Sequence, residues 1–184
     1  MKKAILSIFI LCLHLTAFAE NVVIQSPDGN LKVNLFLETG SLKYNVLYKG
    51  KTIIEDSPLG MVTSVSDFSK ELIMIDKTGG LINRSYTENR IKKSQVSYNA
   101  NEVVCDFENP DKEKISVVFR VSDNDIAFKY ILAQTGETAR CIVEKELSGF
   151  KFPAFTTTFL TPQSTPMIGW KMTKPSYEEE YVPD

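Results

Sequence analysis

Histidine is almost missing from this sequence, and its one position limits the chemistry that the chain can perform. The 184 residues include a single histidine, His14, together with three cysteines and one tryptophan. His14 lies in an apolar segment at the start of the chain that we expect to be removed on export. The remaining residues would then contain no histidine, which excludes Ser-His-Asp and Cys-His catalysis and histidine-ligated metal sites within them.

Long apolar runs are missing beyond the first 19 residues, and those residues have the pattern of a secretory signal peptide. Lys2 and Lys3 precede an apolar run from Ala4 to Leu15, and Ala17-Phe18-Ala19 has the small-x-small pattern of a cleavage site. The run is shorter than the roughly 20 residues that a membrane-spanning helix needs. We therefore predict a signal peptide over residues 1–19, no membrane span, and a mature chain outside the cytoplasm.

An excess of positive charge is absent from the mature chain. Removing Lys2 and Lys3 with the signal leaves 165 residues with 19 basic and 23 acidic side chains, a net charge of −4. Nucleic-acid binding needs a basic face or stripe, and none is evident, so we predict no nucleic-acid partner. The length is sufficient for one domain with a substantial core, and we predict a single domain over residues 20–184.

Cysteine is scarce as well. Cys12 lies within the signal, and its apolar neighbours do not form a lipobox, which argues against a lipoprotein anchor. Cys105 and Cys141 remain, and each alternates with apolar neighbours along a predicted strand. Two buried thiols are the favoured prediction, because unbonded cysteine is commonly buried. A disulfide between them, which an oxidising compartment permits, is the alternative, and no C-x-x-C pair indicates a zinc or redox motif.

Apolar residues alternate with polar ones through most of the mature chain, and helical periodicity is nearly absent. The alternation is clearest in five segments: 31–37, 42–48, 103–107, 115–121 and 126–132. A period of two is typical of strands that bury one face. Short strands at this spacing predict an all-β fold, an antiparallel β-sandwich.

Turn residues separate the predicted strands. They occur at Gly40, Lys49-Gly50, Asn109 to Lys112 and Ser122 to Asp125. The segment Asp67 to Ile75 is compatible with one or two helical turns. We favour a strand there, because Leu72 to Ile75 is an apolar run, and we expect a turn at Thr78-Gly79-Gly80 to close it.

The last part of the sequence has a different texture. Proline is dense from Pro153 onward, which predicts irregular loops in place of strands. The final residues, Tyr177 to Asp184, neither close a strand pattern nor cap a helix. We therefore expect the chain to be an incomplete sandwich, a fragment of a longer protein.

Acidic residues in loops are the only candidates for glycosidase or calcium chemistry, and none makes a convincing set. Glycosidases need two carboxylates across a sugar ring, and calcium needs several oxygen ligands. Asp123-x-Asp125 resembles the start of a calcium loop but lacks the glycine and glutamate that should follow, so a hairpin turn is favoured. The other acidic groups are Glu55-Asp56 and Glu178 to Glu180. For Glu178 to Glu180 we favour a solvated acidic loop; the alternative is a loop that faces a cationic or metal-bearing site on a neighbouring domain. No catalytic, cofactor or metal residue is assigned.

Aromatic residues near the end of the chain have two interpretations. Trp170, Tyr177 and Tyr181 could stack on sugar rings, but we favour packing at the end of the sandwich or against another domain. Ser26 and Ser57 precede prolines in Ser-Pro-Asp-Gly and Ser-Pro-Leu-Gly, and we interpret both as turn residues, since no base accompanies them.

Three stretches, in this order, carry a resemblance to a known family. The first is Ser26-Pro27-Asp28-Gly29-Asn30-Leu31-Lys32-Val33 together with Leu42 to Lys51, the second is Ser57-Pro58-Leu59-Gly60, and the third is Phe119 to Tyr130. Together they resemble the amino-terminal domain of glycoside hydrolase family ninety-seven, over nearly the whole mature chain. Asp125 stands where the pattern of the family has a glycine.

The resemblance implies an architecture and a chemistry. Members combine an amino-terminal super-sandwich, a central (β/α)₈ barrel that holds the catalytic carboxylates, and a small carboxy-terminal β-domain. One branch inverts at the anomeric carbon and uses calcium, and the other comprises retaining α-galactosidases. The amino-terminal domain packs on the barrel and, in the calcium branch, supplies one glutamate ligand. No position up to Asp184 matches that ligand, so none is transferred.

The sequence therefore leads to one favoured expectation and two alternatives. The favoured one is the amino-terminal part of a periplasmic, Ca²⁺-dependent, inverting α-glucosidase that hydrolyses α-glucan oligosaccharides from starch. Its partner would be its own catalytic barrel, and the chain alone would be inactive. The alternatives are a non-catalytic β-sandwich that binds glycans or a protein, and the retaining α-galactosidase branch of the same family.

Overall fold

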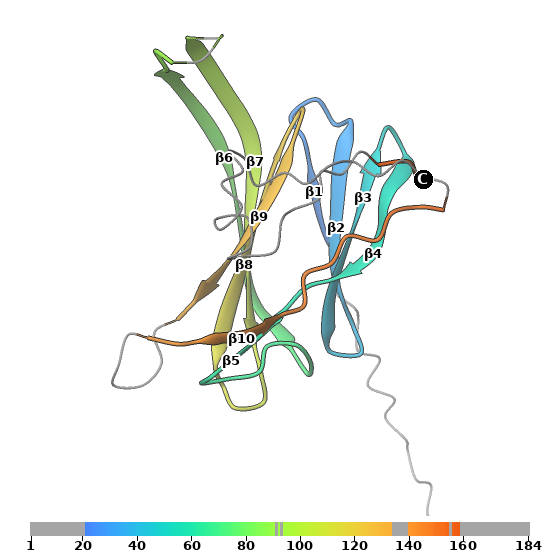
Figure 1. Ribbon diagram of the computed structural model, residues 1–184, viewed down its shortest axis with the longest axis vertical. Coiled ribbons are helices and arrows are strands. Elements are labelled where there is room, and N and C mark those ends of the chain that lie inside the picture. The colour runs from blue at the N-terminus through green and yellow to red at the C-terminus, as the bar shows by residue number, and fades with distance from the viewer. Residues whose placement is uncertain (1–20, 91, 93, 134–139, 155, 159–184) are drawn as a thin grey trace, which may run out of the picture. The chain divides into compact units, whose positions relative to one another are not determined.

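The computed structural model describes residues 21–90, 92, 94–133, 140–154 and 156–158. The chain divides into two compact units, Met1–Phe152 and Pro153–Asp184, and every strand named here belongs to the first. All the regular elements of the described residues are strands, shown in Figure 1. Their bounds are β1 Val22–Gln25, β2 Leu31–Glu38, β3 Ser41–Tyr48, β4 Lys51–Pro58, β5 Met61–Thr63, β6 Ile73–Thr87, β7 Gln95–Glu108, β8 Lys114–Ser122, β9 Ile126–Leu132 and β10 Val143–Glu146.

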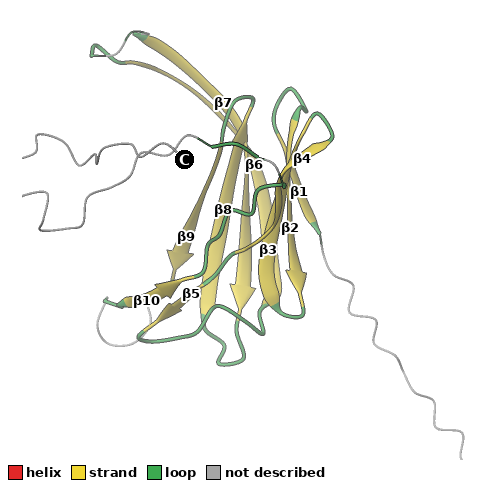
Figure 2. Cartoon of the chain, turned by 45° about the vertical axis from the view of Figure 1, so that its right-hand side comes forward, coloured by secondary structure: helices red, strands yellow, loops and turns green. Residues whose placement is uncertain are grey.

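Two four-stranded antiparallel sheets form the body of the first unit. The first has the strand order β1-β2-β3-β4 and the second β6-β7-β8-β9, so each is a simple meander of consecutive strands. The sheets lie face to face, with β1 and β2 against β7 and β8 (Figure 2). A third, two-stranded sheet pairs β5 with β10. The predicted all-β antiparallel sandwich is confirmed.

The core lies between the inner faces of the two large sheets. Because alternate residues of a strand point to opposite faces, the apolar residues predicted to share a face do so here. On the first sheet, Val33 and Leu35 of β2 lie opposite Val46 and Tyr44 of β3. The second sheet contributes these buried residues: Cys105, Phe107, Ile115, Val117, Phe119 and Val121.

Aromatic rings meet at the centre of this core. The ring centroid of Phe119 on β8 lies 5.8 Å from that of Tyr44 and 5.4 Å from that of Phe128. The Tyr44 hydroxyl donates a hydrogen bond to the Gly149 carbonyl oxygen at 3.1 Å, which satisfies a polar group that the core would otherwise bury unpaired. Burial raises the pKa of Tyr44 to about 12, so this hydroxyl stays protonated at physiological pH.

Residues 147–151 run along one side of the sandwich and bind β4 and the link to β5. The backbone N–H groups of Leu147 and Gly149 donate to the carbonyl oxygens of Gly60 and Pro58 at 2.9 and 3.0 Å. The N–H of Lys151 donates to the hydroxyl of Ser57 at 2.9 Å. Ser57 is therefore a buried residue at the end of β4, and the prediction that it forms part of a turn is wrong. Its hydroxyl binds the backbone of residue 151.

Most predicted turns are confirmed, including the one at Gly40. Gly40 has φ of 79°, and an added Cβ would lie 2.8 Å from the Cα of Glu71, so a larger residue would clash with the backbone as well as strain the turn. The carbonyl oxygen of Gly40 accepts a hydrogen bond from the N–H of Leu72 at 2.8 Å. The β2–β3 turn is therefore packed directly against the chain that leads into β6.

The predicted turn at Thr78-Gly79-Gly80 is wrong. A strand does begin in this region, but it continues through both glycines to Thr87, and Gly79 and Gly80 pair with Val103 and Glu102 of β7. Glycine marks a turn when it supplies a positive φ, and neither residue has one here. Pairing with the long strand β7 lets β6 continue past Gly79 and Gly80, where the sequence of β6 predicted that the strand would end.

The prediction of two buried thiols is correct for Cys105 and wrong for Cys141. Cys105 lies on the inner face of β7, whereas Cys141 is exposed just before β10. The alternation around Cys141 belongs to β10, which pairs only with the short strand β5 among the described strands and buries neither face. The two cysteines, both in the described part of the chain, do not form the alternative disulfide.

Truncating the central aromatic residue should be costly. Phe119 has no exposed surface, and Phe119→Ala should lower the free energy of unfolding by about 3–5 kcal/mol because it leaves a cavity between the sheets. The matched control is Ile131→Ala on β9, where the side chain is 45% exposed and the loss should be below about 1 kcal/mol. Urea unfolding followed by circular dichroism measures both, and equal losses would contradict this account of the core.

Candidate functional site

The carboxylates of Glu55 and Asp56 lie on β4 and bind neighbouring side chains. A Glu55 carboxylate oxygen lies 3.0 Å from the Lys151 ammonium nitrogen. An Asp56 carboxylate oxygen accepts a hydrogen bond from the Asn45 side-chain amide at 2.7 Å. As successive residues of one strand, the two side chains point to opposite faces and cannot lie across one sugar ring.

Asp123 and Asp125 lie in the hairpin turn between β8 and β9, as predicted. The hydroxyl of Ser122 accepts hydrogen bonds from the N–H groups of Asn124 and Asp125 at 3.2 and 3.0 Å, which is local turn chemistry. Asp123 instead makes a long-range contact, because its carboxylate accepts a hydrogen bond from the N–H of Asp28 at 2.8 Å. This turn is therefore bound to the first turn of the chain.

Asp28 organises that first turn. Its carboxylate accepts hydrogen bonds from the Ser26 hydroxyl at 2.5 Å, from the Asn30 N–H at 2.9 Å and from the Asn30 side-chain amide at 2.5 Å. These bonds, that from Ser26 foremost, lower the pKa of Asp28 to about 2. The Ser-Pro-Asp-Gly motif is thus a hydrogen-bonded turn, as predicted, and Ser26 is not placed to act as a nucleophile.

The remaining candidates from the sequence lie outside the described residues: Cys12, His14, Trp170, Tyr177, Glu178 to Glu180 and Tyr181. Within the described ranges, no group of three or more His, Cys, Asp or Glu side chains is placed to hold a metal ion. In that same part of the chain, no helix is long and apolar enough to span a membrane.

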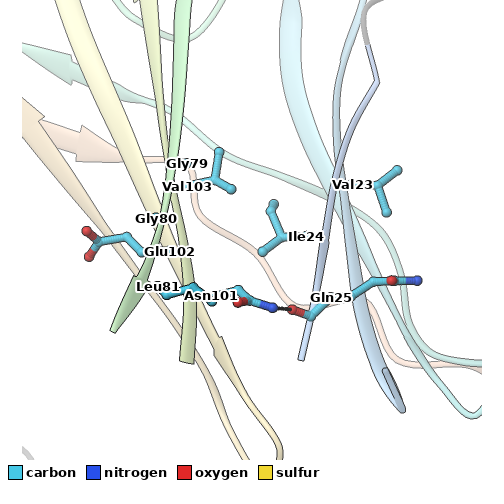
Figure 3. Close-up of a pocket in the computed structure, with 9 residues that line it drawn as sticks. All are labelled: Val23, Ile24, Gln25, Gly79, Gly80, Leu81, Asn101, Glu102 and Val103. Atoms are coloured by element: carbon cyan, nitrogen blue, oxygen red, sulfur yellow. Dashed lines mark hydrogen bonds between the residues drawn. The ribbon is translucent and has the colours of Figure 1, made fainter. Parts of the chain in front are cut away.

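A groove that the sequence did not indicate separates the edge strand β1 from the β6–β7 hairpin. It is open and has a volume of about 850 Å³, within the range of ligand sites in proteins. Figure 3 shows its lining: Val23, Ile24, Gln25, Gly79, Gly80, Leu81, Asn101, Glu102 and Val103. Gly79 and Gly80 have no side chains to fill this space. The sequence did not indicate the groove, because the two glycines were predicted to form a turn and not to line a strand.

One hydrogen bond crosses the groove. The side-chain amide of Asn101 on β7 donates to the Gln25 carbonyl oxygen on β1 at 2.6 Å and joins the two sheets at this point. The side chain of Glu102 points away from the groove (Figure 3). Its carboxylate accepts a hydrogen bond from the Arg120 guanidinium at 2.5 Å. The groove thus offers backbone edges, amides and the exposed Leu81 to a ligand, but no pair of carboxylates for acid–base catalysis.

Comparison with known proteins identifies the family. The model of the family described as Glycosyl-hydrolase 97 N-terminal matches residues 24–184. A solved structure described as a beta-arabinopyranosidase is 49% identical, with a TM-score of 0.82, over 90% of this chain. A Glycoside Hydrolase Family 97 enzyme from Pseudoalteromonas sp. strain K8, solved in complexes with panose and with acarbose, is 26% identical, with a TM-score of 0.67, over 72% of this chain.

A curated relative is described with a different activity from that of the beta-arabinopyranosidase. The protein described as "Probable retaining alpha-galactosidase" from Streptomyces bingchenggensis (strain BCW-1) is 28% identical over 137 residues, which is 74% of this chain. The chain spans only a fraction of these proteins: 26% of the beta-arabinopyranosidase and 20% of the Pseudoalteromonas enzyme and of the alpha-galactosidase.

Removing the strongest partner of Asp28 should shift its titration. In the Ser26→Ala variant we expect the pKa of Asp28 to rise from about 2 toward 3.8, because the hydrogen bond that contributes most is lost. A lowered pKa stabilises the fold above pH ~4, and this contribution is lost as the pH falls toward 2. NMR titration of the Asp28 carboxyl carbon tests this. Ser97→Ala, a distant serine on β7, is the control and should leave the midpoint near 2; an unchanged midpoint in Ser26→Ala would contradict the assignment.

Proposed function

This chain belongs to the glycosyl-hydrolase 97 N-terminal family, and from that premise we propose that it is the amino-terminal domain of an exported glycoside hydrolase. The observation that carries the proposal is the match of the family model over residues 24–184. The catalytic acid and its partner carboxylate lie in another part of that protein. The domain serves as a scaffold, and residues 1–19 direct the protein to the periplasm.

The preferred substrate is a β-L-arabinopyranoside or an α-D-galactopyranoside. The support is the 49% identity to a beta-arabinopyranosidase, against 26–28% for the other relatives, one of which is described as an alpha-galactosidase. The two sugars have the same configuration at every ring carbon and differ by the hydroxymethyl group of galactose. A pocket shaped for one ring can therefore hydrogen-bond the hydroxyl groups of the other, whereas a glucoside presents its 4-hydroxyl in the wrong direction.

A second candidate is the Ca²⁺-dependent, inverting α-glucosidase that acts on oligosaccharides from starch. It is favoured by the complexes of the Pseudoalteromonas relative with panose and acarbose, but at a lower identity. Among the described residues, no group of three or more His, Cys, Asp or Glu side chains is placed to hold calcium. In both candidates a carboxylic acid protonates the leaving oxygen. The second carboxylate acts as the nucleophile in a retaining enzyme and as the base that activates water in an inverting one.

Substrate preference separates the two candidates. With aryl glycosides, we expect the full-length protein to show a kcat/KM for β-L-arabinopyranoside or α-D-galactopyranoside at least roughly 100-fold above that for α-D-glucopyranoside, because a misplaced hydroxyl leaves polar groups of the pocket unpaired. Residues 20–184 alone should release no sugar. Preferential hydrolysis of maltooligosaccharides that is lost with a chelator would favour the second candidate. No hydrolysis of any glycoside would overturn the proposal.

A further inference from the structure

The β6–β7 hairpin extends well beyond the rest of its sheet. The two strands pair from Ile73 opposite Glu108 to Thr87 opposite Gln95. The neighbouring strand β8 ends at Ser122, opposite Ala100, so the part of the hairpin past that point has no third strand. Figure 1 shows this part projecting past the ends of the other strands. We call residues 82–87 and 95–100 the arm.

The arm has one polar face and one apolar face. Paired residues of an antiparallel ribbon point to the same side, so the register assigns each residue to a face. One face is entirely polar: Asn83, Ser85, Thr87, Gln95, Ser97 and Asn99. The other face carries the apolar residues and one arginine: Ile82, Arg84, Tyr86, Val96, Tyr98 and Ala100.

Most of the apolar face is not covered within the described part of the chain; its base is covered, because Ala100 is buried where β8 ends. Among the described strands, β6 makes extensive contact with β7 alone. Tyr86 is 50% exposed, Arg84 is exposed and Val96 is half-buried. Tyr98 is half-buried, and its side chain forms a hydrogen bond with that of Asp125 in the β8–β9 turn. A two-stranded ribbon is only marginally stable in water unless its apolar face packs against something. An arm with one wholly polar and one largely apolar side therefore indicates a surface that packs against a partner.

We propose that the apolar face of the arm is the docking surface for the rest of the hydrolase polypeptide, the part that follows residue 184. The inference rests on the proposed function. The matched relatives provide the occupant, because this chain corresponds to only 20–26% of their length. In such a protein, three quarters or more of the chain is available to cover the face.

Charge distinguishes this occupant from a second copy of the same domain. Residues 82–100 carry four basic side chains (Arg84, Arg90, Lys92 and Lys93) and one acidic, Glu88, a net charge of +3 in a chain of net charge −2. Two arms packed face to face would bring like charges together, with Arg84 in the middle of each apolar face. The occupant is therefore an apolar surface that presents carboxylates or backbone carbonyls to Arg84.

Thiol labelling of the full-length protein tests whether the face is covered. In a Cys141→Ser background, which removes the exposed cysteine, the variants Tyr86→Cys and Ser85→Cys place a thiol on neighbouring residues of opposite faces. We expect the thiol at 86 to react about tenfold or more slowly than the thiol at 85, because it is accessible only when the contact opens. Equal rates, or protection that disappears on dilution, would overturn the proposal.

Photo-crosslinking then identifies the occupant while keeping an aromatic ring at the contact. The variant Tyr86→p-benzoylphenylalanine should form crosslinks to residues beyond 184 of the same chain, whereas the same substitution at Ser85 should form few. Crosslinks to a second copy, to residues 21–158, or equally from both positions would overturn the inference. Hydrolysis of aryl glycosides is measured on the same preparations. Activity with an uncovered arm contradicts only the docking proposal, and a covered arm without any hydrolysis contradicts only the proposed function.

Discussion

The structure depends on the burial of two apolar sheet faces against each other, centred on the contact of Phe119 with Tyr44 and Phe128. Each of the two large sheets has a single inner face, and neither could remain in water with that face exposed. Burial also specifies register: a one-residue slip of β2 would move Val33 and Leu35 from the core to solvent. The apolar core therefore determines which strand residues face inward and, through the strands, where the turns fall.

Polar groups that would otherwise be buried without a partner form hydrogen bonds with segments from other parts of the fold. Tyr130 illustrates this arrangement: its hydroxyl accepts a hydrogen bond from the Gly60 N–H at 2.9 Å and lies 2.7 Å from the Ser148 hydroxyl oxygen. Asn109 is similar, because its side-chain amide donates to the Ser66 hydroxyl at 2.7 Å and to the Asp67 carbonyl oxygen at 3.1 Å. Such bonds each contribute modestly, but losing one partner would leave a buried group unpaired.

The described residues are organised as packed sheets, turns and exposed surfaces. Of the loop carboxylates that the sequence singled out, Asp123 is bound to the first turn of the chain, and Glu55 and Asp56 bind neighbouring side chains. What distinguishes the domain is the groove beside β1 and the arm of β6 and β7; the arm results from a hairpin that is longer than the neighbouring strand β8. This is the character expected of a domain that supports a catalytic partner.

The strands β2, β3, β8 and β9, part of β7, the inner faces of these strands and most turns were predictable from the sequence, because alternation with a period of two and turn chemistry are local signals. The family was predictable from three sequence stretches. The inner residues of β2, β3 and β8 follow that alternation directly. Three features depended on the tertiary structure. Gly79-Gly80 continues a strand because β7 lies alongside it, and Cys141 is exposed because β10 finds only the short β5 as a partner. The groove forms where β1 lies beside residues 79–81 and 101–103, and the arm exists because β6 and β7 extend past the end of β8; both depend on contacts between segments that are distant in the sequence.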